Sequence, residues 1–184
     1  MSNRGRLIVV SGPSGVGKGT IVAKVVQMSD AQVSVSATTR NPGKGEQNGV
    51  NYWFISRQEF EKRIQDGMFL EYAEVFGNLY GTMKDKTALL LNEGKTVILE
   101  IDVQGGLQVK TAYPDAVMIF ILPPDMAELE RRIRSRGRDS EDTIRTRLAK
   151  AEKEIAVGKT DYKHLVVNDD LDAAVAQVMT IIGK

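Results

Sequence analysis

The fold class is decided by nine residues near the start of the chain, which read Gly12-Pro13-Ser14-Gly15-Val16-Gly17-Lys18-Gly19-Thr20. An apolar run at residues 7–11 precedes them, and apolar residues recur at helical spacing over residues 20–28. The order is therefore strand, glycine-rich loop, helix. In this order, successive backbone N–H groups can surround a phosphate, and the helix N-terminus adds the positive end of its dipole. We predict a phosphate-binding loop in which Lys18 contacts the β- and γ-phosphates of a nucleotide.

One position of this loop departs from the strict pattern, which places Ser or Thr directly after the lysine. Here that position is Gly19, and Thr20 follows it. Glycine suits the loop because a side chain would block the backbone from approaching a phosphate, and because some positions need a positive φ. A bound Mg²⁺ would then have Thr20 as its protein ligand, or waters alone. The alternative to a phosphate site is a turn that only joins strand to helix, and the strand–loop–helix context disfavours it.

Outward from the loop, strands and helices alternate along most of the chain. Further strands are expected at residues 33–37, 96–101, 117–122 and 165–167, and further helices at residues 106–113, 125–136, 140–156 and 171–182. This alternation implies a parallel sheet with helices on both faces. We therefore predict an α/β fold with a parallel five-stranded sheet.

The segment at about residues 38–90 interrupts this alternation. It contains a loop at residues 40–49, strands at 50–55 and 68–76, a turn at 77–82 and a helix at 82–92. A further helix begins after Ser56, with Glu59 as its capping-box partner. We predict a small inserted lobe at residues 38–90, with residues 1–37 and 91–184 forming the core domain.

Composition narrows the classes of function. The 184 residues suit one domain, and 42% apolar with 27% charged residues is typical of a globular protein. The net charge of +1 disfavours a nucleic-acid or membrane-surface partner. The absence of cysteine excludes disulfides and thiolate chemistry. The longest apolar run, Val117–Leu122, is too short to span a bilayer, and we expect a cytoplasmic protein.

Several segments, in order over nearly the whole chain, resemble guanylate kinases. Besides the loop, they are residues 36–52 around Ser36-Ala-Thr-Thr-Arg40 and Gly45-Glu46, Glu71 with Gly77-Asn-Leu-Tyr80-Gly-Thr82, Glu100-Ile-Asp102, Arg136-Gly137, Arg147-Leu148 and Val167-Asn168-Asp169-Asp170. The resemblance implies a P-loop NTPase fold and an enzyme that uses ATP and Mg²⁺ to phosphorylate GMP, and dGMP as well. It also implies that residues 38–90 bind GMP and that a lid lies at about residues 132–148.

The resemblance assigns roles to individual residues. On the ATP side, Lys18 with Arg136 and Arg147 of the lid would act in catalysis, and residues 12–20 with Asn168 would bind the nucleotide. Arginine suits the transferring phosphoryl group because its planar fork offers several donors at once. The alternative is that the arginines of this segment form a solvated basic face, and we accept that interpretation for those other than Arg136 and Arg147.

On the GMP side, the resemblance places Arg40 on the phosphate, with Glu46 in the same segment and with hydroxyls from Tyr52 and Tyr80. Guanine has two adjacent donors, and a carboxylate such as Glu71 can accept from both. Hydroxyls from Ser36 and Thr82 could donate to O6 or N7, and Asp102 would reach either the guanine amino group or the Mg²⁺ waters. A second departure lies here, because the family usually has another arginine three residues after Arg40 and this chain has Gly43-Lys44.

Phosphoryl transfer to a phosphate needs cations that neutralise charge, and it needs no side chain that removes a proton. In the reaction that the resemblance implies, the nucleophile would be a phosphate oxygen of GMP, and a phosphate monoester with a second pKa of about 6 is mostly ionised at neutral pH. Two rival functions remain at this point. One is a non-catalytic guanylate-kinase-like module that binds protein ligands, and Lys18, Arg136 and Arg147 disfavour it. The other is a P-loop kinase for a different small acceptor, which Glu71 disfavours.

Overall fold

The computed structural model describes residues 5–135, 137 and 139–183. Its main sheet has five strands in the order β2-β7-β1-β8-β9, and every neighbouring pair is parallel. The predicted parallel five-stranded sheet is therefore confirmed. The strands are β1 (Leu7–Ser11), β2 (Gln32–Val33), β7 (Val97–Glu100), β8 (Val117–Leu122) and β9 (His164–Val167).

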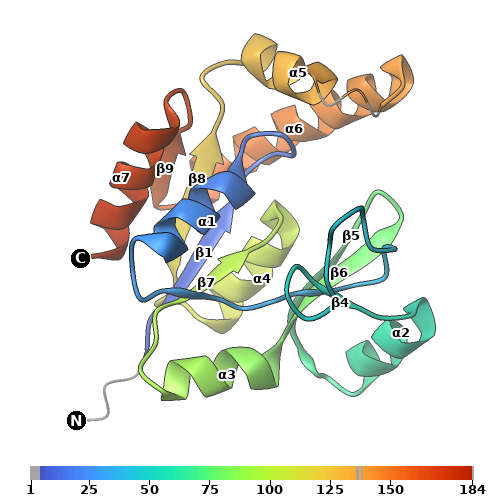
Figure 1. Ribbon diagram of the computed structural model, residues 1–184, viewed down its shortest axis with the longest axis vertical. Helices are drawn as coiled ribbons and strands as arrows, with labels where there is room; N and C mark the ends of the chain where they lie inside the picture. Colours follow the sequence, from blue (N-terminus) through green and yellow to red (C-terminus); the bar gives the residue numbers. More distant parts are fainter. Residues whose placement is uncertain (1–4, 136, 138, 184) are drawn as a thin grey trace.

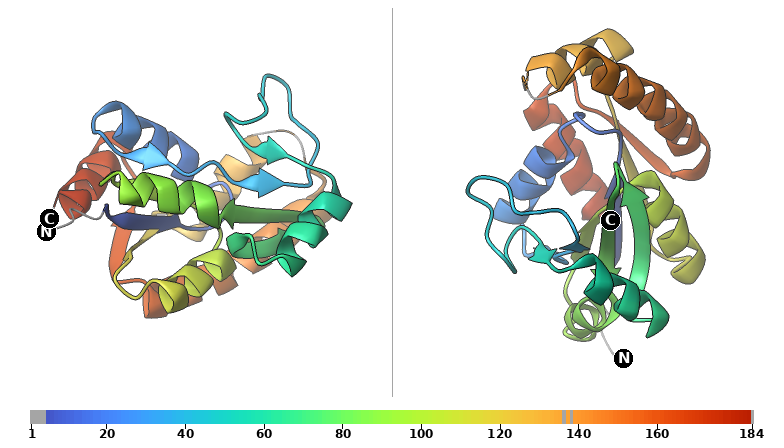
Figure 2. Two further views of the ribbon diagram at one scale, coloured as in Figure 1. Left: turned by 90° about the horizontal axis from the view of Figure 1, so that it is seen from below. Right: turned by 90° about the vertical axis from the view of Figure 1, so that its right-hand side faces the viewer.

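Helices cover both faces of this sheet, as Figure 1 and Figure 2 show. All five residues of β1 are buried, which is typical of a central parallel strand. Ile8 and Val10 belong to the core with α1 (Lys18–Gln27) and α7 (Leu171–Ile182). Leu7 and Val9 face the opposite core, with α4 (Val103–Ala112). The alternation of side chains along one strand thus builds two separate cores.

A second, four-stranded sheet lies beside the first, in the order β4-β3-β6-β5. Its strands are β3 (Ala37–Thr38), β4 (Trp53–Phe54), β5 (Phe69–Val75) and β6 (Asn78–Met83). The helices α2 (Arg57–Gln65) and α3 (Lys84–Asn92) complete this part of the chain. The Ser56 side chain accepts from the Glu59 backbone N–H, so Ser56 is confirmed as the helix cap. The Glu59 carboxylate, expected to complete a capping box, accepts from Arg63 at 2.7 Å.

Three local predictions in this part were wrong. Residues 77–82 are not a turn but mostly strand β6, which pairs with β5 in an antiparallel hairpin, and α3 begins only at Lys84. The expected strand at residues 33–37 is two short strands in different sheets, because the chain crosses from one sheet to the other at residues 34–36. The expected strand at residues 50–55 is reduced to β4.

The C-terminal part consists of α5 (Met126–Ser135), α6 (Glu141–Asp161), β9 and α7. Helix α6 is longer than the predicted 140–156. Gly158 allows this, because any side chain at that position would overlap the ring of Phe120 in β8. Among the described residues, no helix is both long and apolar enough to cross a bilayer.

Candidate active site

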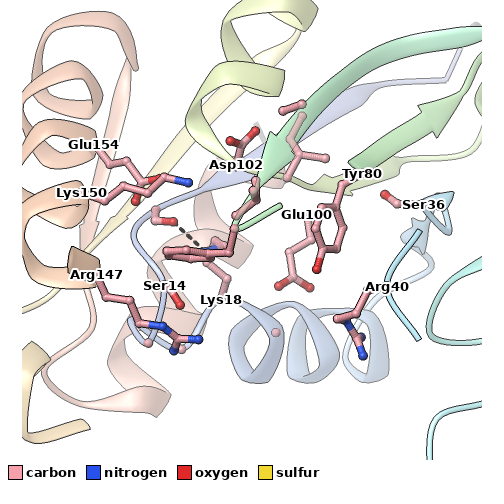
Figure 3. Close-up of a pocket in the computed structure, with 18 of the residues that line it drawn as sticks. Ser14, Lys18, Ser36, Arg40, Tyr80, Glu100, Asp102, Arg147, Lys150 and Glu154 are labelled. Atoms are coloured by element: carbon pink, nitrogen blue, oxygen red, sulfur yellow. Dashed lines mark hydrogen bonds and ion pairs between the residues drawn. The ribbon is translucent and has the colours of Figure 1, made fainter. Parts of the chain in front are cut away.

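A cavity of about 530 Å³ opens between the carboxyl ends of the parallel strands, α6 and the second sheet. Ligands of open α/β sheets bind at this edge. In Figure 3, Arg147 and Lys150 come from α6 on one side. On the other side, Tyr80 comes from β6, and Ser36 and Arg40 come from the segments that flank β3. The cavity brings together most of the predicted site residues, namely Gly12, Ser14, Gly15, Gly17, Lys18, Gly19, Thr20, Ser36, Arg40, Tyr52, Glu71, Tyr80, Asp102 and Arg147.

The glycine-rich loop lies between β1 and α1, as its sequence predicts. Gly15 and Gly17 have φ values of 88° and 98°, a region that side chains disfavour. The Lys18 ammonium donates to the carbonyl oxygens of Gly12 at 2.6 Å and Pro13 at 3.3 Å. Lys18 is thus folded back over the loop that it follows.

Asn168 contributes to this loop from outside the cavity. It is buried, and its amide nitrogen donates to the Val16 carbonyl at 2.7 Å. Arg132 adds donors to the Asn168 carbonyl at 3.0 Å and to the Val16 carbonyl at 3.4 Å. The residues that line the cavity do not include Asn168, Pro13 or Val16, which the resemblance assigned to ATP.

Arg40 is held at the opposite end of the cavity. Its guanidinium forms an ion pair with Glu46 at 2.8 Å and lies over the Tyr52 ring at 5.5 Å. Glu46 also accepts from the Gly43 N–H at 2.5 Å, and these two donors hold the pKa of its carboxyl below the usual value. Glu46 does not line the cavity. It orients Arg40 toward the cavity from behind.

Glu71 is the buried carboxyl of the site, with 3% of its surface exposed. The Thr82 hydroxyl donates to its Oε1 at 2.6 Å, so Thr82 serves Glu71 and does not line the cavity. Burial raises the pKa of Glu71 to about 7, although the Thr82 hydrogen bond acts in the opposite direction. The other carboxylate oxygen lies against Gly105, where any side chain would overlap it.

Asp102 stands next to Glu71 and begins α4. Its Oδ1 accepts from the Gly105 N–H at 2.9 Å, which caps the helix. Its Oδ2 is buried and has no hydrogen-bond partner among the described residues. A buried acceptor without a partner is costly, and a ligand that donates to it would remove that cost.

The cavity is also lined by residues to which sequence reasoning gave no role, namely Ala73, Val75, Phe76, Glu100, Ile101, Lys150 and Glu154. Arg147, Lys150 and Glu154 are spaced by three and four residues along α6, which places them on one face of the helix. That spacing was the available signal. Glu100 ends β7, and desolvation within the cavity raises the pKa of its carboxyl while the charge of Lys18 opposes the shift.

Arg147 faces the cavity from α6 with part of its guanidinium unused. Its Nη1 lies 3.1 Å from Asp139, whereas its buried Nε has no hydrogen-bond partner among the described residues. An incoming anion could accept from that Nε. Arg136, the other arginine predicted for catalysis, lies outside the described residues.

Comparison with known proteins identifies the family of the chain that forms this cavity. The family model described as guanylate kinase matches residues 4–184. A guanylate kinase from Clostridium perfringens is 51% identical over 98% of this chain and 84% of its own length, and one from Thermus thermophilus is 49% identical over 97% and 81%. A solved guanylate kinase from Anaplasma phagocytophilum superposes with a TM-score of 0.82 at 33% identity, over 98% of this chain and 85% of its own. The chain therefore belongs to the guanylate kinase family.

Proposed function

We propose that this cavity transfers the γ-phosphate of ATP to GMP, and also to dGMP, to give ADP and GDP or dGDP. The chain is accordingly a kinase that acts on a nucleoside monophosphate. One observation carries the residue assignments. The glycine-rich loop with Lys18 and the buried carboxyl of Glu71 open into the same cavity, so a polyphosphate and a guanine can be held together.

The donor half of the proposed reaction uses residues 12–20. Backbone N–H groups of the loop bind the phosphates of ATP, and Lys18 neutralises the charge on the β- and γ-phosphates. Asn168 supports ATP binding indirectly, because its hydrogen bond fixes the loop at Val16. Arg147 supplies donors to the transferring phosphoryl group, and its buried Nε is available for that purpose.

The phosphate of GMP binds to Arg40, Tyr52 and Tyr80 in this proposal. All three line the cavity, and the Tyr52 ring lies within 5.8 Å of the Tyr80 ring. Burial raises the pKa of Tyr52 to about 12, so its hydroxyl keeps its proton and can donate to a phosphate. The ion pair between Arg40 and Glu46 prevents the guanidinium from moving away.

Guanine recognition rests on Glu71. Its carboxylate can accept from the N1–H and the 2-amino group of guanine, whereas adenine lacks this donor pair. The unpartnered Oδ2 of Asp102 offers a further acceptor for the amino group. Ser36 lines the cavity and can donate to O6. Thr82 contributes by fixing Glu71 rather than by touching the base.

The proposed reaction needs no side chain that removes a proton. The acceptor phosphate is already largely ionised, so the site must align two polyanions and reduce their repulsion. Lys18 and Arg147 face the cavity from different elements, and Arg136 would join them from the proposed lid. Because water would compete as acceptor, we also propose that the lid at about residues 132–148 and the lobe at residues 38–90 close over the substrates.

The residues present fit a Mg²⁺ ion bound mainly through phosphates and waters. The described residues include no group of three or more His, Asp and Glu side chains that could hold a metal alone. Magnesium typically keeps several waters and takes one or two protein oxygens. The Thr20 hydroxyl and the carboxylates of Glu100 and Asp102 all line the cavity. The ion would neutralise charge on the β- and γ-phosphates.

The test is an ADP-release assay with ATP and Mg²⁺ in which GMP, dGMP, AMP, CMP and UMP are offered separately. We expect turnover with GMP and dGMP and little with the other three, because only guanine offers two donors to Glu71. Turnover with AMP or a pyrimidine in preference to GMP would reject the role of Glu71. No turnover with any acceptor would favour a binding module instead.

A further inference from the structure

Phe76 occupies the turn between β5 and β6 in a conformation that a bulky residue rarely adopts. Its φ is 49°, and among the described residues it is the only one other than glycine with a positive φ. The residue is 46% exposed, so it is not held there by a hydrophobic core. A strained backbone at such a site persists only where other interactions fix it. The hairpin itself fixes the backbone, because Val75 pairs with Asn78 across a two-residue turn in which Gly77 also has a positive φ.

The turn places the Phe76 ring against two cations of α6. The Arg147 guanidinium carbon lies 5.2 Å from the centre of the Phe76 ring, and the Lys150 ammonium lies 5.0 Å from it. Both distances are within the range of cation–π attraction. All three residues line the cavity. The ring therefore connects the second sheet to the helix that carries the cations, across the cavity mouth.

Each cation is also held on its other side by an acidic group. Arg147 lies 3.1 Å from Asp139, and Lys150 lies 3.5 Å from Glu154. Each cation therefore has two partners, a carboxylate and the Phe76 ring, and the two contacts together restrict its position. Removing the ring would leave the charges in place but would broaden the positions that they occupy.

We propose that Phe76 is a positioning residue for phosphoryl transfer, which holds Arg147 and Lys150 at the cavity through its ring. This inference rests on the proposed function. The β5–β6 hairpin also carries Glu71 and Tyr80, which we assign to GMP. Through this contact, the sheet that carries Glu71 and Tyr80 sets the position of the cations on α6. Misplaced cations reduce stabilisation of the transition state more than they reduce binding of GMP.

The strained backbone of Phe76 allows an experiment that separates a positioning role from a purely structural one. Asn tolerates a positive φ and has no ring, so Phe76→Asn relieves the strained backbone and removes the platform. A residue that only supports the fold would lose activity and thermal stability together. A positioning residue held under strain should lose activity while the thermal midpoint stays the same or rises.

The experiment compares wild type with Phe76→Asn, Phe76→Leu and Phe76→Tyr in the ADP-release assay and in thermal unfolding. We expect kcat to fall about tenfold in the Asn and Leu variants, with KM for GMP changed by less than about threefold. Phe76→Tyr, which keeps the π face, should restore kcat to within about twofold of wild type. The Leu variant separates the ring from apolar bulk, because it has similar bulk and no π face.

The outcomes separate the two proposals. If wild type fails to phosphorylate GMP, the proposed function is rejected whatever the variants do. If wild type is active, this inference is overturned by any of three results in the Asn and Leu variants, or by a fourth in the Tyr variant. These are an unchanged or increased kcat in Phe76→Asn, a wild-type kcat in Phe76→Leu, and a fall in thermal midpoint that matches the loss of activity. A failure of Phe76→Tyr to restore kcat would also overturn it.

Discussion

The two sides of the cavity are built in different ways. The side that we assign to ATP, the donor side, is the contiguous segment 12–20, which comprises the loop between fully buried β1 and α1 and the first turn of α1. Four of the seven residues that it contributes to the cavity are glycines. The acceptor side consists of side chains from separated segments of a sheet whose strands include two of only two residues. Backbone N–H groups recognise any phosphate, whereas side chains can recognise one base among several.

The groups on the two sides are also held differently before substrate arrives. Buried Asn168 ties the donor loop to the core through a neutral hydrogen bond. On the acceptor side, Arg40 is paired with Glu46 and Glu71 with Thr82. Mutations on the donor side should therefore impair turnover with every acceptor. Mutations on the acceptor side should change which acceptor is used, and how tightly.

The largest effect is expected for Lys18→Ala. Loss of the ammonium removes the side-chain charge beside the donor phosphates, so kcat should fall on the order of a thousandfold with every acceptor that wild type uses. The matched control is Lys24→Ala, on the same helix but paired with exposed Asp172. ADP release measures both variants. Activity of Lys18→Ala within about tenfold of wild type would contradict the assignment of the donor loop.

The second effect tests the acceptor side alone. Glu71→Gln replaces one carboxylate oxygen by an amide donor that opposes the guanine donors, so KM for GMP should rise about tenfold to a hundredfold. KM for ATP should change little. The measurement is initial rate against GMP at saturating ATP. An equal rise in both KM values would show that the two sides are not separable.

The pKa of Glu71 sharpens this test. Because that pKa is raised to about 7, the carboxyl gains a proton as pH falls through neutrality and loses acceptor capacity for guanine. KM for GMP in wild type should therefore rise between about pH 8 and pH 6. The GMP phosphate titrates in the same range in both proteins, so Glu71→Gln is the control. An identical pH profile in the variant would remove Glu71 from base recognition.

The contrast between the two sides also explains what could be predicted from sequence. The fold of the donor loop was predictable because its glycines and the strand and helix that flank it are consecutive in the sequence. Helix α7 was predictable because its apolar spacing continues over residues 171–182. Strand β6 was missed because Gly77 and Gly81 suggested a turn, while its pairing with β5 is a property of two segments. The hydrogen bonds of Asn168 and Thr82 involve distant partners, and no spacing in the sequence reveals them.

A smaller effect is expected for Asn168→Ala. Its side chain reaches the donor loop only from behind, so KM for ATP should rise several-fold while KM for GMP stays within about twofold. Loss of a buried hydrogen bond should also lower the free energy of unfolding by about 1–2 kcal/mol. Steady-state kinetics and denaturant unfolding measure the two quantities. An unchanged KM for ATP together with lowered stability would mean that Asn168 supports only the fold and not ATP binding.

The smallest expected effect is that of Glu71→Gln on stability. The substitution should stabilise the fold, whereas it should impair the use of GMP. Burial raises the pKa of Glu71 from 4.5 to about 7, so the folded state holds a proton that the unfolded state has lost between those values. This group therefore contributes a destabilisation that is absent below about pH 4.5 and complete above about pH 7. Glu71→Gln keeps the acceptor for Thr82 and removes the buried charge.

The thermal midpoint of Glu71→Gln should therefore exceed that of wild type by a few degrees at about pH 8 and by much less at about pH 5. The comparison needs no substrate, so it is independent of catalysis. A midpoint difference that does not depend on pH would mean that Glu71 is not strained by its burial. If the difference appears, the acceptor side gives up stability to keep a carboxylate ready for guanine, whereas the donor side, built from backbone, has no such requirement.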